Sequence, residues 1–145
     1  MSTNTGHWSA QGLSLDPEHA EGFVYLIIEK DTSKAYIGLK HYRLRGKRKG
    51  QQSNWKTYTS SSTWVKQLIA ERGVDNFDFI ILEQYYTRGG LSFAEVWTQV
   101  SCEIPSQNEK YFNRFIDKIT FKVTEPVTPR HKKRLKYYLR KYKLA

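Results

Sequence analysis

The first clear pattern of apolar and polar positions along the chain indicates a β-hairpin. Residues 23–29 are rich in aromatic and β-branched side chains, and the same composition resumes over residues 35–39. The polar residues 30–33 between them are of the types that form turns. The two segments are therefore expected to pair as antiparallel strands.

After a polar and basic stretch over residues 40–54, the pattern predicts one helix and one further strand. Ser62, a frequent N-cap residue, precedes apolar side chains at helical spacing, and Gly73 closes the run. The apolar set is Trp64, Val65, Leu68 and Ile69. Residues 77–82 are a compact apolar stretch typical of a strand, and the glycine pair at positions 89 and 90 is expected to stop it.

Helices are expected in the last third of the chain. Residues 91–104 and 106–116 suit two helices separated at Pro105, and residues 130–143 suit a basic amphipathic helix. The apolar face of that last helix is Leu135, Tyr138, Leu139 and Tyr142. The order ββαβαα predicts an α+β fold, with a three-stranded antiparallel sheet flanked by helices and a basic C-terminal helix.

Composition favours a single folded domain with a polyanionic partner. The chain has 145 residues, of which 39% are hydrophobic, enough to bury one core. Its net charge of +10 and pI of about 9.7 favour nucleic acid first and anionic membrane surfaces second.

Cysteine usage and the apolar runs narrow the setting of the protein. Cys102 is the only cysteine, which excludes an intramolecular disulfide and a cysteine-based zinc site. No apolar run approaches the roughly 20 residues that span a bilayer, and residues 1–15 lack the pattern of a secretory signal. A cytoplasmic location is therefore expected.

Two tyrosines in the hairpin give the first indication of function. Tyr25 lies on the first strand and Tyr36 on the second, 11 positions later, so hairpin geometry can make them neighbours. Here the chain resembles the GIY-YIG nuclease family, whose two motif tyrosines lie on adjacent antiparallel strands. The second motif, Tyr-Ile-Gly at 36–38, is intact, whereas Phe-Val-Tyr at 23–25 replaces Gly-Ile-Tyr.

The order of later motifs strengthens the resemblance, which is greatest to the small homing endonucleases of phages. In that branch a basic loop, a tryptophan-tyrosine-serine segment, a helix, a glycine and a buried strand follow the second motif. The helix with the catalytic glutamate comes next, and a Tyr-Asn type ending follows it. The matching residues here are Trp55, Tyr58, serines 60–62, Glu95 and Asn113, so the resemblance covers residues 22–113.

The resemblance implies a DNA endonuclease that uses one Mg²⁺ or Mn²⁺ ion. It divides the chain into an N-terminal flexible arm (1–20), a nuclease domain (21–118) and a basic DNA-binding tail (119–145). Water would attack the phosphodiester and the 3′ oxygen would leave. The substrate would be double-stranded DNA in the cytoplasm, which is that of the host cell if the protein is phage-encoded, and a protein partner or a dimer would supply specificity.

Glu95 is the predicted metal ligand, because a carboxylate on a helix can anchor a hard cation that keeps most of its waters. The Trp97 and Gln99 context favours Glu95, whereas Glu103 remains an alternative because its spacing to the Tyr-Asn ending differs. Glu83, at the end of the third strand, is a third candidate.

The tyrosines and Asn113 complete the catalytic set that the resemblance implies. A phenol has a reference pKa of about 10, so a tyrosine that activates water needs cationic neighbours or metal-bound solvent. Tyr25 is expected to position the water and Tyr36 to accept its proton. Asn113 is expected to support the site.

A cation beside the phosphate is also required, and the family places an arginine about ten residues after the second tyrosine. Arg45 lies nine residues after Tyr36 and is the predicted catalytic arginine. Arg43 and Arg48 remain alternatives in the same basic loop. Lys40 and His41 follow the second motif directly and are further alternates for positioning solvent or phosphate.

The other basic and aromatic residues predict contacts with the DNA backbone and bases. A basic helix without acidic residues gains affinity through counterion release, and aromatic rings can stack on bases. Trp64 is expected in the core because of its helical apolar spacing. The predicted DNA-binding residues are Lys47, Arg48, Lys49, Trp55, Lys56, Tyr58, Lys132, Lys133, Arg134, Lys136, Arg140 and Lys141.

Two other functions are compatible with the same sequence. The altered first motif allows a GIY-YIG fold that has lost catalysis and only binds DNA. The small size, charge and aromatic content also allow a basic RNA-binding protein.

Overall fold

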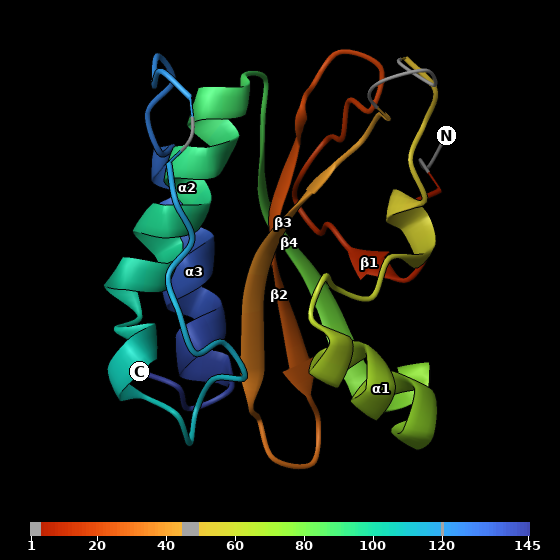
Figure 1. The fold of residues 1–145 in the computed structure, drawn as a ribbon, viewed down its shortest axis with the longest axis vertical. Helices are drawn as coiled ribbons and strands as arrows, with labels where there is room; N and C mark the ends of the chain where they lie inside the picture. Colours follow the sequence, from red (N-terminus) through yellow and green to blue (C-terminus); the bar gives the residue numbers. More distant parts are fainter. Residues whose placement is uncertain (1–3, 45–49, 120) are drawn as a thin grey trace.

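The computed structural model describes residues 4–44, 50–119 and 121–145. At its centre is a four-stranded sheet in the order β1-β4-β2-β3 (Figure 1). The strands are β1 (Trp8–Ser9), β2 (Gly22–Glu29), β3 (Ala35–His41) and β4 (Phe77–Tyr85). β2 pairs antiparallel with both β3 and β4, as the hairpin pattern and the later apolar strand predicted.

The sheet is mixed rather than purely antiparallel, because the N-terminal segment adds β1 parallel to β4. Two residues are too few to show strand alternation in a sequence, so this strand was not predicted. Trp8 holds it in place: the side chain is 3% exposed, and its indole N–H donates to the backbone carbonyl of Trp55 at 2.6 Å.

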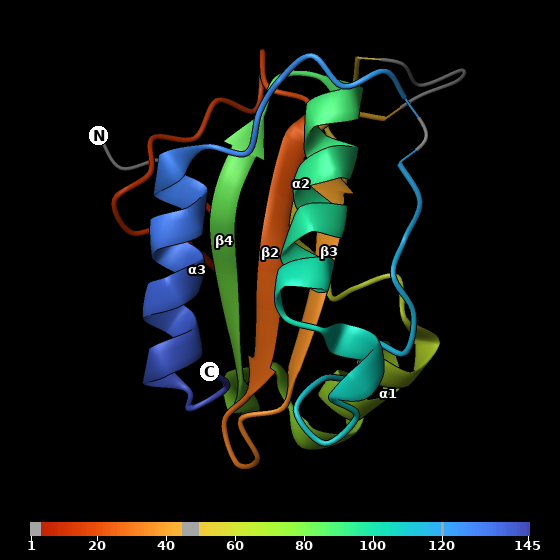
Figure 2. The same ribbon diagram turned by 90° about the vertical axis from the view of Figure 1, so that its left-hand side faces the viewer.

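The helices are α1 (Thr63–Arg72), α2 (Arg88–Ser101) and α3 (Pro129–Lys141), with short 3-10 turns at Trp55–Thr57, Val74–Asn76 and Ile104–Ser106. α2 and α3 cover one face of the sheet, and α1 lies on the other (Figures 1 and 2). α1 is capped by Ser62 and ends at Gly73, as the sequence predicted. Among the described residues, no helix is long and apolar enough to cross a membrane.

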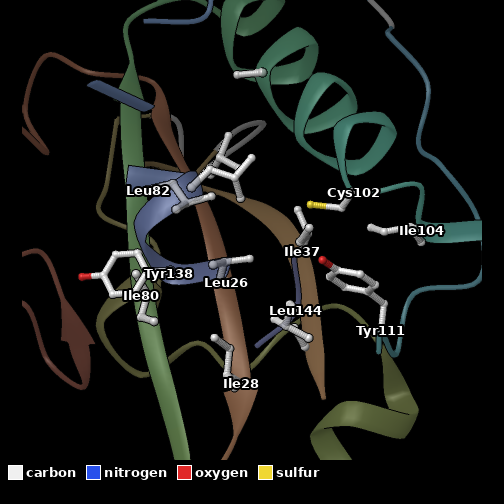
Figure 3. Packing of buried hydrophobic residues seen from close by; sticks show 14 of the residues in the cluster. Leu26, Ile28, Ile37, Ile80, Leu82, Cys102, Ile104, Tyr111, Tyr138 and Leu144 are labelled. Carbon is white, nitrogen blue, oxygen red and sulfur yellow. The ribbon is translucent and has the colours of Figure 1, made fainter. Parts of the chain in front are cut away.

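Two hydrophobic cores lie on the two faces of the sheet. Every residue of β2 is buried, and its side chains alternate between the faces. Leu26 and Ile28 join the core beneath α2 and α3, shown in Figure 3. Phe23, Tyr25 and Ile27 join the core formed with α1 and the N-terminal segment. The first tyrosine therefore lies on the face opposite α2.

The predicted helix over residues 106–116 is wrong. This segment runs along the outer edge of β3, where the Ala35 N–H donates to the carbonyl of Lys110 at 2.9 Å and the Phe112 N–H donates to the carbonyl of Ala35 at 2.7 Å. Tyr111 joins one core and Phe112 the other. Consecutive side chains on opposite faces have the period of a strand, which competes with the helical interpretation.

The start of α2 also differs from the prediction. The helix begins at Arg88, so Gly89 and Gly90 lie in its first turn. A Cβ atom at Gly89 would overlap the backbone of Lys122, which crosses the start of the helix. The glycines therefore permit a close approach of the chain instead of ending a strand.

Both ends of the chain pack against the same sheet. Trp8 joins the core on the α1 face, while Leu135, Tyr138 and Leu144 join the core under α2. The division into an arm, a nuclease domain and a tail at residues 20 and 118 stays a prediction.

Candidate active site at the edge of the sheet

β3 is the edge strand on one side of the sheet, and its outward-facing amides are each satisfied by a different partner. Ala35 donates to the backbone of Lys110, and Ile37 donates to the Oδ1 atom of Asn113 at 2.9 Å. The Leu39 amide lies close enough to the Glu95 carboxyl group to lower its pKa. The amides at the open edge of a sheet lack a neighbouring strand to bond. On β3 they contact side chains instead, and these contacts orient Asn113 and Glu95.

The side-chain amide of Asn113 bonds the edge of β3 in the way that the backbone of a neighbouring strand would. Its Oδ1 accepts from the Ile37 N–H, and its Nδ2 donates to the Ile37 carbonyl at 2.8 Å. The side chain is buried and lines a hollow next to Tyr36. Asn113 therefore fixes the chain that follows Phe112 against β3.

The two motif tyrosines are diagonal neighbours across β2 and β3. Tyr25 pairs with Gly38, Tyr36 pairs with Ile27, and the tyrosine ring centroids are 6.2 Å apart. A Cβ atom at Gly38 would lie 2.6 Å from the Cζ atom of Tyr25. The glycine of the second motif is therefore needed to make room for the first tyrosine.

The two phenols differ in exposure. Tyr25 is fully buried; its hydroxyl lies next to Ser60 and Tyr58, but no atom of the described residues meets the geometry of a hydrogen bond with it. Burial, with smaller contributions from Tyr36, Tyr58 and Glu95, raises the pKa of Tyr25 well above its usual value. Tyr36 is half-buried, and its hydroxyl lies 3.3 Å from the Oγ atom of Ser61. Burial also raises the pKa of Tyr36, so both phenols are neutral at pH 7.

Glu95 reaches this edge from α2, on the opposite face of the sheet. The side chain is 6% exposed. Burial first, and the carboxylate of Asp117 second, raise the pKa of Glu95 to about 9, against the opposing effect of the Leu39 amide. Without a cation, Glu95 therefore carries a proton at neutral pH.

Asp117 is a site residue that the sequence reasoning missed. Its Oδ2 accepts from the Gln99 Nε2 at 3.1 Å, and its N–H donates to the Gln99 Oε1 at 2.9 Å. Gln99 lies one helical turn after Glu95, so α2 orients both carboxyl groups. No short motif indicates Asp117, because the contacts that bring it to Glu95 join distant parts of the chain.

A cleft of about 410 Å³ opens beside these two carboxyl groups, which is within the range of ligand-binding pockets. Tyr58 and Ser61 form part of its wall. Its charged and titratable lining residues are Lys40, His41, Arg88, Glu95, Asp117 and Lys118. A site with two acids among several bases suits a cation together with an anionic substrate.

The donor set fits a hard cation with few protein ligands. In the described part of the chain, no group of three or more His, Cys, Asp or Glu side chains is placed to hold a metal. Mg²⁺ commonly takes only one or two carboxylates from protein and completes its shell with water and phosphate oxygens. Glu95 and Asp117 satisfy that requirement.

A family model described as "Putative endonuclease segE, GIY-YIG domain" matches residues 8–116. The chain belongs to this GIY-YIG endonuclease family. No curated protein and no solved structure matches the chain significantly. The match includes both motif tyrosines, Glu95 and Asn113, and it begins at Trp8, in the segment that forms β1.

The structure separates the three candidate glutamates of this GIY-YIG chain. Glu83 accepts two hydrogen bonds from Arg130, at 3.0 and 2.8 Å, and does not line the cleft. Glu103 is exposed just after α2 and also lies outside the cleft lining. Glu95 alone among the three faces the cleft.

The candidate cations near the second motif have different environments. Arg45 and Arg48, with Lys47 and Lys49, lie outside the described residues. The Nη1 atom of Arg43 donates to the carbonyls of residues 17, 18 and 20, at 3.0, 2.6 and 3.0 Å. Arg43 therefore anchors the N-terminal segment and is not brought to the cleft.

Lys40 and His41 do line the cleft. The Lys40 ammonium lies 4.1 Å from the ring centroid of Tyr58, and burial lowers the pKa of Lys40. The Nδ1 atom of His41 is 2.6 Å from the Oε2 atom of Glu21. Of these two candidate residues, Lys40 faces the cleft with its ammonium group on the Tyr58 ring, and His41 is paired with Glu21.

The tryptophans exchange their expected places. Trp55, predicted to contact DNA, is 0% exposed and packs against Phe23 and Tyr42, so its ring is unavailable for stacking. Trp64, predicted in the core, is 43% exposed. Lys56 is half-buried with its ammonium 5.6 Å from the Trp55 ring centroid.

One predicted DNA contact on α3 points into the protein. Arg134 donates to the carbonyls of Leu82 at 3.0 Å and Ile81 at 2.6 Å, which fixes α3 against β4. The basic composition of the helix does not show which of its cations points inward. The other predicted contacts on α3 are exposed: Lys132, Lys133, Lys136, Arg140 and Lys141.

Proposed function

We propose that the cleft hydrolyses phosphodiester bonds in DNA with the help of one divalent cation, Mg²⁺ or Mn²⁺. The observation that carries this proposal is the burial of the Glu95 carboxyl group beside Asp117, at the edge strand β3, which carries Tyr36 next to Tyr25 on β2. A buried carboxyl group next to a second, exposed one is costly to ionise unless a proton or a cation neutralises it.

Glu95 would hold the cation, and Asp117 would offer the second protein oxygen. When bound, the cation would neutralise the phosphate and stabilise the leaving 3′ oxygen. Cation binding would also release the proton that Glu95 carries at neutral pH, because carboxylate ligands must be ionised.

The tyrosines divide the handling of water between them. When Tyr36 donates to Ser61, the lone pairs of its phenol oxygen can accept a hydrogen bond from the attacking water. Tyr36 is the proposed proton acceptor: as its neutral phenol takes the proton of the water, its own proton would pass to the Ser61 hydroxyl, which would release a proton to solvent. Tyr25 is the proposed positioner, since its buried hydroxyl lacks a partner among the described residues. Water attack would leave a 5′ phosphate and a 3′ hydroxyl.

The altered first motif does not remove a catalytic group. Phe23 and Val24 are fully buried on opposite faces of β2, so the two changed positions serve packing, while the tyrosine is retained. This observation favours a nuclease over a GIY-YIG fold that only binds DNA.

The substrate proposed is double-stranded DNA, held through its phosphates by Lys40 and by the exposed basic residues of α3. A partner or dimer that supplies sequence specificity remains part of the proposal.

The test is cleavage of plasmid DNA by the purified chain in EDTA, Mg²⁺ or Mn²⁺, with Glu95→Ala and the exposed Glu103→Ala as matched variants. We expect nicking or cutting only with a divalent cation, a loss of about 100-fold or more in Glu95→Ala, and wild-type rates in Glu103→Ala. Binding of DNA without cleavage in any cation would support the binding module, and preferential binding of RNA would support the RNA-binding alternative.

A further inference from the structure

Arg88, at the start of α2, has a buried donor without an acceptor. Its Nε atom is buried, and Arg88 forms no hydrogen bond or ion pair with any residue in 4–44, 50–119 or 121–145. A guanidinium group carries five N–H donors and stays charged, so leaving one of them desolvated and unpaired is costly. The side chain lines the cleft that holds Glu95.

Four other arginines, two of them half-buried and two exposed, have acceptors within the protein. Arg43 bonds three backbone carbonyls, and Arg134 bonds the carbonyls of β4. Arg130 and Arg72 pair with the buried carboxylates of Glu83 and Glu29. Arg88 differs from these four because no acceptor of the described residues lies within hydrogen-bond distance of its Nε atom.

The guanidinium group is nevertheless held in place. Its central carbon lies 4.5 Å from the ring centroid of Phe121. Stacking on an aromatic face fixes the plane of a guanidinium and leaves its edge available for hydrogen bonds. The close crossing of the chain at Gly89, where a Cβ atom would overlap Lys122, keeps the segment that carries Phe121 against the helix.

Arg88 and Glu95 are correctly spaced to act on one ligand. They are seven residues apart on α2, so they share a helix face and are separated by about 10 Å along the axis. A phosphate group and a cation together can fill that interval. A guanidinium also matches the oxygen geometry of phosphate with two parallel donors.

We propose that Arg88 binds a non-bridging oxygen of the DNA phosphate that is cleaved, and that this phosphate completes the hydrogen bonding of its Nε atom. The inference rests on the proposed nuclease function and adds a phosphate-binding cation on α2 to those predicted in the basic loop after the second motif. Helix α2 would then hold both the anion-binding and the cation-binding side of the site.

The kinetic test compares single-turnover cleavage by Arg88→Ala and Arg88→Lys with that of wild type and of Glu103→Ala, whose acid is exposed outside the cleft. We expect Arg88→Ala to lose on the order of 100-fold in rate with a much smaller change in DNA affinity. Added guanidinium ion should restore part of the lost rate, and the melting temperature should not fall. Cleavage by Arg88→Ala within threefold of wild type would overturn the inference, as would a fall in melting temperature without rescue.

A second measurement decides the same point without cleavage. In EDTA, the Nε–H NMR signal of Arg88 is followed while inorganic phosphate, and then a short DNA duplex, is added to the wild-type chain. We expect this signal to shift, while that of Arg72, paired with Glu29, stays in place. An unmoved Arg88 signal overturns the inference. Absence of cleavage in every cation, together with a shifted Arg88 signal, would instead reject the nuclease function and keep the phosphate site.

Discussion

The two buried polar regions next to α2 differ in how their groups are satisfied. Between α2 and α3, both ring nitrogens of His131 have partners: Nδ1 lies 2.8 Å from the Tyr85 hydroxyl, and Nε2 lies 2.8 Å from the Thr98 hydroxyl. At the cleft, the Arg88 Nε atom has no partner among the described residues, and the same holds for the Tyr25 hydroxyl, which is buried on the other face of the sheet.

The difference separates groups completed by folding from groups that a ligand would complete. Buried polar groups in native proteins almost always find partners, so unpaired ones need an explanation. Burial lowers the pKa of His131 to about 3 and keeps the ring neutral within a closed network. Burial and Asp117 raise the pKa of Glu95 to about 9 in a cleft that is open to solvent. The first region stabilises the fold, and the second is where we propose that a cation and a phosphate bind.

The largest effect is expected for Tyr25→Phe. We expect cleavage to fall about 100-fold, because the positioning hydroxyl is lost. Stability should stay equal or rise, because an unpaired buried hydroxyl is removed. Single-turnover cleavage and thermal unfolding measure the two effects. A lower melting temperature would show that the hydroxyl is bonded in the native fold.

The matched change in the closed network is Tyr85→Phe. The Tyr85 hydroxyl bonds His131 and accepts from the Thr128 N–H at 3.2 Å. Its removal should lower the free energy of unfolding by about 1–3 kcal/mol, measured by urea denaturation, because buried partners are left unpaired. Cleavage at a temperature where the variant is folded should match wild type. A neutral effect on stability would contradict the assignment of this region to the fold.

The pH dependence of stability sharpens the same contrast. In the folded protein the pKa of His131 is about 3, against an ordinary value of 6.5, so below pH 6.5 the unfolded chain binds a proton that the folded protein does not. Stability is therefore lost as pH falls from 6.5 towards 3, by up to about 1.4 kcal/mol per pH unit. Denaturation at pH 6.5, 5.5 and 5.0 checks this. His131→Gln should flatten the slope, and an unchanged slope would exclude His131 as its source.

The smallest effects concern the two kinds of cation on α3. Lys136→Ala should weaken DNA binding modestly and lower the slope of log affinity against log salt by about 1, without changing the melting temperature. Arg134→Ala should instead lower the melting temperature, because two β4 carbonyls lose their donor. Equal effects of both variants on DNA binding would place Arg134 on the DNA-binding surface after all.

Local patterns were sufficient to predict the central hairpin, β4 and α1. β2 and β3 alternate between two faces, and Ser62 and Gly73 bound α1. The pattern of apolar residues did not predict the structure of residues 106–116, which contribute side chains to both faces of the sheet. Tyr111 and Phe112 look like neighbours on a helix, but they enter opposite cores.

The site was predictable only where short motifs or the family pattern carry it. Tyr36 and Glu95 were predicted, and their roles stay predictions until tested. Asp117 owes its place to Gln99 and the edge of β3, and Arg88 owes its place to glycines that permit a close crossing of the chain. Such contacts join residues far apart in sequence, so no local spacing reveals them.

The most direct test of the central claim is the binding of Mn²⁺ to the purified chain, followed by electron paramagnetic resonance, with Glu95→Gln and Glu83→Gln as matched isosteric variants. We expect one bound Mn²⁺ ion per chain in the wild type and in Glu83→Gln. We expect loss of that ion in Glu95→Gln, whose melting temperature should be equal or higher because a buried acid is removed. Undiminished Mn²⁺ binding by a folded Glu95→Gln chain would contradict the account.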